Sequence, residues 1–188
     1  MVYYTREKKG GGNIFKTVDL RVLRTKKSIM DAFIKLLQTK NFEKITVTDI
    51  AKVANINRRT FYIHYADIFS LLEEFENNLT DEFQKEVTDK LPQDLYEFQM
   101  LILDFLCSHR LLMIALLSNS ASNFLSKVMQ IANDAGFATS EFKKQEEQKY
   151  WWNYIKHGMC YVLLEWLKSQ DLSRDQMVRL STKLISNT

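Results

Sequence analysis

The sequence contains few residues that break helices. Its 188 residues include one proline and five glycines, and three of those glycines are consecutive at Gly10, Gly11 and Gly12. Leu, Lys, Glu and Gln, which favour helices, are abundant. A chain with this composition is predicted to be all-α, and the glycine triplet prevents regular structure near its start.

Disulfides and apolar segments are also scarce. The chain has only two cysteines, Cys107 and Cys160, which fit a reducing compartment and exclude a disulfide framework. No apolar run reaches the roughly 18 residues of a membrane span. The opening MVYYTREKKGGG lacks the apolar centre of a signal peptide. We therefore expect a cytoplasmic protein with no membrane partner.

The patterns that mark enzymes are missing as well. The sequence has no nucleophile–base pair, no metalloprotease motif and no phosphate-binding glycine loop, because Gly10–Gly12 lacks a flanking strand and helix. We expect neither an enzyme nor a cofactor. Cys107, His109, His157 and Cys160 are a conceivable zinc set, but C-x-H with H-x-x-C is not a common zinc spacing. Buried thiols and packed histidines are the preferred interpretation.

Charge is distributed unevenly along the chain. Residues 1–65 hold 14 of the 26 Lys and Arg residues but only 5 of the 23 Asp and Glu residues. The first third therefore carries a net charge of +9 and the remainder −6. Chance clustering of surface charge is one explanation. The other is a head that binds a polyanion, joined to a body with a different task.

The expected organisation has three parts. Residues 1–22 form a flexible basic arm, which either lies in a DNA groove or has no specific role. Residues 23–68 form a three-helix amino-terminal domain, and residues 69–188 form a larger helical domain. Periodicity, caps and the break at Pro92 place helices at about 25–39, 46–54, 57–65, 67–90, 93–107, 109–118, 122–134, 141–168 and 173–186.

The segment TVTDIAKVANINRRTFYIHY predicts two short helices around a tight turn. Thr46 and Asp49 have the spacing of a capping box. Asn55 tolerates the left-handed conformation that ends the first helix, and Ile56 fills the turn. Asn57 is a good N-cap for the second helix. This order of caps and turn is that of a helix-turn-helix.

The second helix of this motif has two different faces. Phe61 and Tyr65 are expected to face a core that includes Ile50 and Phe33. Arginine side chains can form bidentate hydrogen bonds with guanine, and hydroxyl and imidazole groups can bind phosphate. The outer face is therefore predicted to bind DNA through Arg58, Arg59, Thr60, Tyr62 and His64, with Ile63 placed to touch a thymine methyl. The alternative is a solvated helix start with a packed histidine.

The stretch ITVTDIAKVANINRRTFYIHYADIFSLL resembles the DNA-binding head of the TetR family of bacterial transcriptional regulators, over roughly residues 24–72. The resemblance implies an all-helical homodimer that grips a palindromic operator on double-stranded DNA with two copies of the second helix. It implies base reading by Arg58 and Arg59, phosphate or base-edge contacts by Thr60, Tyr62 and His64, and a backbone contact by Thr46.

The chain departs from the family pattern at two points. Asn55 stands where the family often has glycine. The family often has a lysine at the start of the next helix, aimed at a phosphate, whereas this chain has Ala66-Asp67-Ile68-Phe69. The backbone contact that is lost there is expected from Lys26, Lys27 or Lys44 instead.

The carboxy-terminal helices resemble the family's dimerisation helices less specifically. Residues at helical spacing are expected in the dimer interface, or alternatively in the protomer's own core: Ile155, Gly158, Met159, Val162, Trp166, Met177, Leu180 and Leu184. A pocket for a small apolar effector is expected at Met100, Leu103, Met113 and Phe124, although such stripes are more often plain core.

These observations lead to two hypotheses. The first is a dimeric TetR-type repressor that a small-molecule effector releases from DNA. The second keeps the same fold but acts through a protein partner, as a co-activator does, and it depends on the missing lysine.

Overall fold

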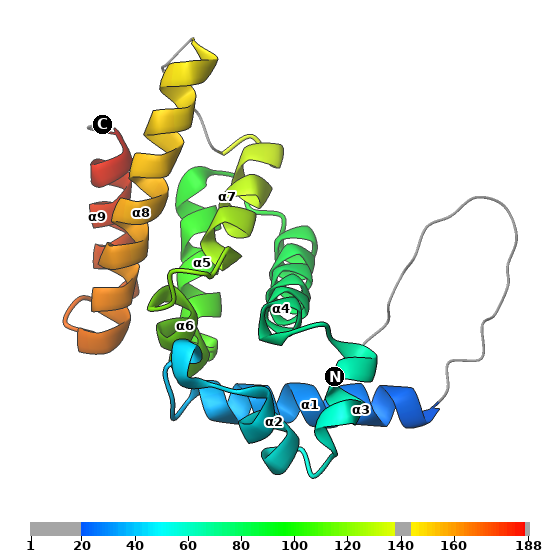
Figure 1. Ribbon diagram of the computed structural model, residues 1–188. Coiled ribbons are helices and arrows are strands. Elements are labelled where there is room, and N and C mark those ends of the chain that lie inside the picture. The colour runs from blue at the N-terminus through cyan, green and yellow to red at the C-terminus, as the bar shows by residue number, and fades with distance from the viewer. Residues whose placement is uncertain (1–19, 138–143, 187–188) are drawn as a thin grey trace, which may run out of the picture.

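The computed structural model describes residues 20–137 and 144–186 of the chain (Figure 1). These residues form nine α-helices and one short 3-10 helix and contain no strand. The elements are α1 (Leu20–Leu37), η1 (Phe42–Lys44), α2 (Val47–Val53), α3 (Arg58–His64), α4 (Ile68–Lys90), α5 (Leu95–Ser108), α6 (Arg110–Leu117), α7 (Phe124–Asp134), α8 (Gln145–Ser169) and α9 (Arg174–Ser186). The all-α prediction is confirmed.

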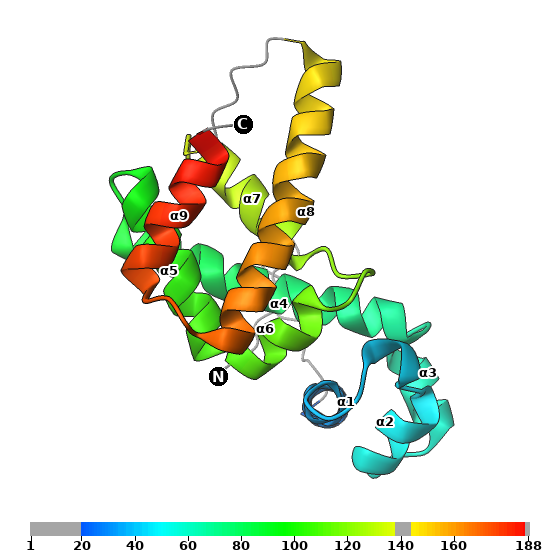
Figure 2. The same ribbon diagram turned by 90° about the vertical axis from the view of Figure 1, so that its left-hand side faces the viewer.

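The helices form a small head and a larger body. Figures 1 and 2 show α1, α2 and α3 together at one end of the molecule, with α4 leading from the head into the body. Helices α5 and α7 pack beside α4, α6 packs against α8, and α8 and α9 lie side by side along an outer edge.

Most helix limits agree with the sequence within a few residues, and α1 is the exception. It begins at Leu20 rather than near Thr25, so residues 20–22, which were expected in the basic arm, are helical. The prediction followed the buried stripe, and that stripe starts only at Ile29. Leu and Arg continue the helix outward because they are good helix formers even when exposed. The rest of the arm and the expected start of α8 at Glu141 lie outside the described residues.

The end of α4 explains the break near Pro92. Leu91 ends this helix in the left-handed conformation, with φ of 46°. A non-glycine residue pays about 1–2 kcal/mol for that conformation. The proline that follows cannot continue a helix. Together they turn the chain into α5, whose N-cap Asp94 accepts a hydrogen bond from the backbone N–H of Glu97.

One hydrophobic core runs through the head and the body. Phe33 of α1 is fully buried and meets Phe75 of α4 edge to face, at a ring-centroid distance of 5.9 Å. Further along α4, Phe83 meets Phe105 of α5 at 5.3 Å. Burying a side chain of this size contributes about 1.5–3 kcal/mol. The aromatic contacts therefore hold α4 to both parts of the molecule.

A buried carboxylate joins α4 to α7. Glu76 is only 2% exposed. Its Oε1 accepts hydrogen bonds from the Ser122 hydroxyl at 2.6 Å and the Asn123 backbone N–H at 3.0 Å, and its Oε2 lies 3.3 Å from Lys127 Nζ. A buried charge is tolerated only with such partners. Helix α7 begins at Phe124, two residues after the expected start, and Ser122 binds Glu76 instead.

Within the two described ranges, no single helix is long and apolar enough to cross a membrane. Helices α5 and α6 reach the length and apolar composition of a membrane span only when taken together, and they are bent by 100° relative to each other.

Substituting Glu76 tests how much the fold depends on this contact. Glu76→Ala should lower the free energy of unfolding by about 2–4 kcal/mol, because the Ser122 and Asn123 donors lose a charged acceptor inside the protein. Glu73→Ala, at an exposed position on the same helix, should change it by less than about 0.5 kcal/mol. Urea unfolding followed by circular dichroism measures both, and equal effects would contradict the account.

Candidate nucleic-acid interface

Helix α2 starts with the predicted capping box. The Thr46 hydroxyl accepts a hydrogen bond from the Asp49 backbone N–H at 3.1 Å, and the Asp49 carboxylate accepts one from the Thr46 backbone N–H at 2.9 Å. Asp49 also pairs with Lys40 at 2.8 Å. The Lys40 ammonium and the two Thr46 donors lower the pKa of Asp49 to about 2. These contacts fix where α2 begins.

The turn after α2 also follows the prediction. Asn55 is left-handed, with φ of 54°. The Ile56 N–H donates to the Ala51 carbonyl at 2.9 Å, and the Asn55 N–H donates to the Lys52 carbonyl at 3.3 Å. This pair of bonds is a Schellman motif, which satisfies the last carbonyls of the helix. The turn therefore sets the angle between α2 and α3.

Helix α3 is capped and packed as expected. Asn57 is its N-cap and accepts a hydrogen bond from the Arg59 backbone N–H at 2.9 Å. Phe61 is fully buried and Tyr65 is 4% exposed. Ile50 and Phe33, the predicted core partners, are fully buried too. The inner face of α3 is thus fixed against the head.

The outer face of α3 carries the predicted DNA-binding side chains. Arg58, Arg59 and Tyr62 are exposed, and the first turn contains no acidic residue. Thr60 and His64 are half-buried at its margin. Ile63 is 71% exposed, which is high for an isoleucine. Two arginines on an exposed helix face without acidic neighbours present a cationic surface suited to a polyanion.

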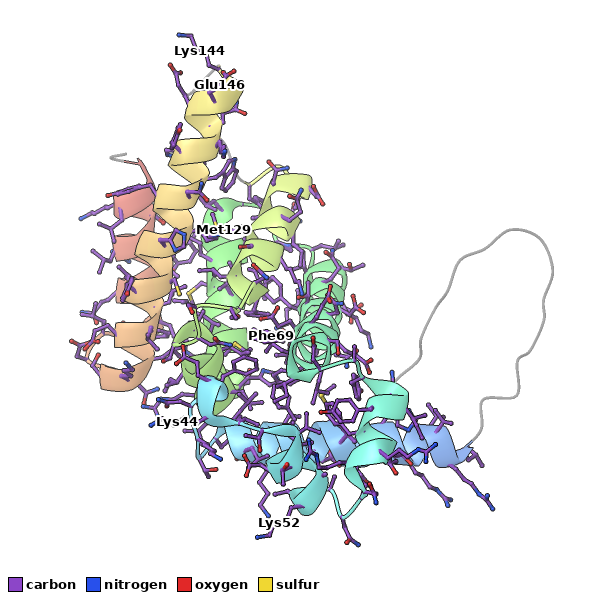
Figure 3. The ribbon with its side chains drawn as sticks, in the orientation of Figure 1. Lys44, Lys52, Phe69, Met129, Lys144 and Glu146 are labelled. Carbon is purple, nitrogen blue, oxygen red and sulfur yellow. The ribbon has the colours of Figure 1, made fainter. Side chains whose placement is uncertain are left out.

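Of the three lysines expected to bind the DNA backbone, two are exposed and one is held in an ion pair. Lys27 and Lys44 are exposed. Lys26 instead forms an ion pair with Glu74 of α4, at 2.7 Å. Lys52, which the sequence analysis did not single out, projects from α2 away from the body (Figure 3). Lys52 lies outside the apolar stripe of α2, and this position was the available sign that it is exposed.

The lysine-free start of α4 has a structural explanation. Asp67 is the N-cap of α4, and its carboxylate accepts a hydrogen bond from the Ser70 backbone N–H at 2.7 Å. The Ser70 hydroxyl in turn accepts one from the Asp67 N–H at 3.2 Å. Phe69 is 60% exposed and packs on Phe42 of η1 at a ring-centroid distance of 5.4 Å. The acid at this point stabilises the helix start.

The residues expected in the effector pocket lie on helices α5, α6 and α7 of the body. Leu103 and Met113 are buried, and Met100 is half-buried. Phe124 alone of the four lines a narrow void between α4, α5 and α7, whose other lining residues are Phe83, Ile102, Phe105, Leu106, Leu125 and Val128. The void leaves essentially no room even for a water molecule, so it is not a preformed ligand pocket.

The expected interface residues divide between two faces of α8 and α9. Ile155, Trp166 and Met177 are buried in the protomer's own core, and Met159 and Val162 are half-buried. Gly158, Leu180 and Leu184 are exposed. The exposed face of α8 also carries three tyrosines that the sequence analysis missed, Tyr150, Tyr154 and Tyr161, which are 72%, 63% and 77% exposed. Their helical spacing was the available signal.

The conceivable zinc ligands are not brought together. Among the described residues, no cluster of three or more His, Cys, Asp or Glu side chains is arranged to hold a metal ion. Both thiols, Cys107 and Cys160, are free and half-buried, and burial raises the pKa of each.

A capped helix-turn-helix with an exposed cationic second helix, set on an all-helical body, is an arrangement typical of DNA-binding regulators. Residues 29–75 match the model for bacterial regulatory proteins of the tetR family. Over 59 residues the chain is 42% identical to an uncharacterised HTH-type transcriptional regulator of Bacillus subtilis (strain 168), YxbF; the match covers 31% of this chain and 16% of that relative.

Solved structures extend the likeness in fold to the body. A TetR transcriptional regulator from Streptococcus agalactiae 2603V has a TM-score of 0.70 and 23% identity, covering 89% of this chain and 96% of that one. The Thermus thermophilus repressor FadR, solved with lauroyl-CoA, has a TM-score of 0.54 and 17% identity, covering 86% and 93%. The head is thus similar in sequence to the tetR family over residues 29–75, and the chain as a whole has the fold of solved TetR regulators.

The capping box predicts a pH-dependent stability. The pKa of Asp49, about 2 in the folded protein, is below its ordinary value of 3.8, so its contribution is full above about pH 4 and is lost as pH falls through 2. Asp49→Asn should therefore destabilise the protein at pH 6, and its difference from the wild type should shrink toward pH 2. Urea unfolding across this range tests it. A difference independent of pH would contradict the assignment.

Proposed function

We propose that this protein is a dimeric transcriptional repressor that binds a palindromic operator with two copies of α3. The observation that carries the proposal is the outer face of α3, where Arg58, Arg59 and Tyr62 are exposed on a helix fixed by its inner face. Arg58 and Arg59 read guanine edges in the major groove. Thr60, Tyr62 and His64 donate to phosphates and set the register of the helix on DNA.

The head carries further positive charge outside this helix. Lys27, Lys44 and Lys52 are exposed and come from three different elements of the head. Thr46, the N-cap of α2, is proposed to contact the DNA backbone, as the resemblance to the TetR family implies. Each phosphate that a lysine or arginine neutralises releases counterions, so binding should weaken steeply with salt.

A second copy of the chain is proposed to pack on the exposed face of α8 and α9. Tyr150, Tyr154 and Tyr161 leave a large aromatic surface uncovered beside Gly158. A Cβ at Gly158 would meet nothing within 4 Å inside the protomer. Glycine in a helix costs about 1 kcal/mol relative to alanine, so close approach of a partner helix gives it a purpose. Leu180 and Leu184 extend this surface onto α9.

Release from DNA is proposed to follow binding of a small apolar effector in the body. The void at Phe124 is too narrow for such a ligand as it stands, so the ligand would have to part α4 from α5 and α7. Because α4 leads directly to the head, this change would move α3. A ligand that prefers the parted arrangement shifts the protein toward it. Lauroyl-CoA, the ligand of one regulator of similar fold, is a suitable first probe.

The alternative of a co-activator acting through a protein partner is not favoured. It was based on the missing lysine at the start of α4, and the capping role of Asp67 accounts for the acid there.

Substitutions on α3 test its role as the reading helix. Arg58→Ala and Arg59→Ala should each reduce preference for the operator over unrelated DNA by about 1–3 kcal/mol. Tyr62→Phe should weaken binding to all sequences to a similar extent, because a phosphate contact carries no sequence information. Gel-shift titrations on the DNA upstream of the gene, with unrelated DNA as competitor, measure both effects. Unchanged operator affinity in all three variants would exclude α3 as the reader.

A further inference from the structure

Three side chains from three elements meet at the carboxy-terminal end of α3. The Tyr65 hydroxyl donates a hydrogen bond to Glu74 Oε1 at 3.1 Å. Lys26 Nζ of α1 donates to Glu74 Oε2 at 2.7 Å. The same ammonium lies 5.2 Å from the centroid of the Tyr65 ring, within the range of a cation–π contact. We call Lys26, Tyr65 and Glu74 the head triad.

The triad is partly shielded from water. Tyr65 is 4% exposed, and the Lys26 and Glu74 side chains are 31% and 36% exposed. Burial raises the pKa of the Tyr65 phenol well above its usual range, and the negative charge of Glu74 raises it further. The phenol is therefore protonated across the physiological range and acts as a donor. Both oxygens of Glu74 accept hydrogen bonds, one from each of its partners.

The position of the triad matters because α3 is short. Its seven residues would not form a stable helix alone, so the direction of α3 depends on what holds its two ends. The turn at Asn55 and the cap at Asn57 hold the first end. Tyr65, the residue that closes α3, holds the second end by bonding to α4.

We propose that Glu74 is a positioning residue for DNA binding. It holds the end of α3 against α1 and α4, and it commits Lys26 to this internal contact instead of to a DNA phosphate. This inference rests on the proposed DNA-binding function. It gives a function to Glu74, whose negative charge alone would repel a polyanion.

An effect of charge alone and a positioning role predict opposite changes in DNA binding when Glu74 is substituted. Replacing an acid near DNA with a neutral amide should tighten binding if only charge matters. Glu73→Gln makes the same change of charge at an exposed position one residue earlier on α4, so it measures the charge effect alone. Glu74→Gln should instead weaken operator binding about tenfold relative to Glu73→Gln, as expected for loss of a charge-assisted hydrogen bond.

The salt dependence of binding separates the two roles of Lys26. Loss of a lysine that contacts a phosphate lowers the slope of log K against log salt by about 0.9. Lys26→Met should weaken binding at every salt concentration and leave this slope unchanged. Lys26→Met and Glu74→Gln should also be non-additive in a double-mutant cycle, because both break one contact.

Tyr65→Phe keeps the ring and its packing, so it folds even if the other variants do not. It should weaken operator binding, and its effect should be non-additive with that of Glu74→Gln. Binding by Glu74→Gln equal to that of Glu73→Gln, a slope reduced by about 0.9 in Lys26→Met, or additivity with Tyr65→Phe would overturn the proposal. Failure of the wild-type protein to bind its upstream DNA would instead overturn the proposed function, and the inference with it.

Discussion

The buried carboxylate of Glu76 constrains how the two parts of this protein can move. It is 2% exposed and keeps its charge compensated only while α4 stays against Ser122, Asn123 and Lys127. Two residues earlier, Glu74 bonds to the head. Helix α4 is thus tied to the head and to the body within one turn. A movement of α7 away from α4 would leave a buried charge without its partners, so the body cannot rearrange there without affecting the helix that carries α3.

Helix α3 has one side that is packed in the fold and another that is exposed. The inner side of α3 is committed to the core through Phe61 and Tyr65, and the capping residues are committed to the turn. The side chains of Arg58 and Arg59 contribute to neither, and they are exposed on a rigid support. Side chains held on a rigid element suit recognition, because little order is lost on binding. The exposed tyrosines of α8 are likewise held on a helix whose other face is packed in the body.

The parts of the structure that depend on neighbours in the sequence were predictable. The capping box at Thr46, the left-handed Asn55 and the N-cap Asn57 involve residues two to five positions apart, and each takes its expected form. The ion pair of Glu74 with Lys26 and the contacts of the Glu76 carboxylate join residues 46 to 51 positions apart, with no local pattern to mark them. Periodicity also grouped Ile155 with Gly158, although one faces the protomer's core and the other faces outward. Spacing gives a helix face, but tertiary packing decides what covers it.

The central claim is that two copies of α3 read one operator, and DNase footprinting tests it most directly. The wild-type protein on its upstream DNA should protect two half-sites related by a dyad, with centres about one DNA turn (34–36 Å) apart. Gly158→Glu, which should block close approach at the exposed face of α8 without disturbing the protomer, should lose the paired protection. A single unpaired half-site in the wild type, no protection at all, or a paired footprint unchanged in Gly158→Glu would contradict the account.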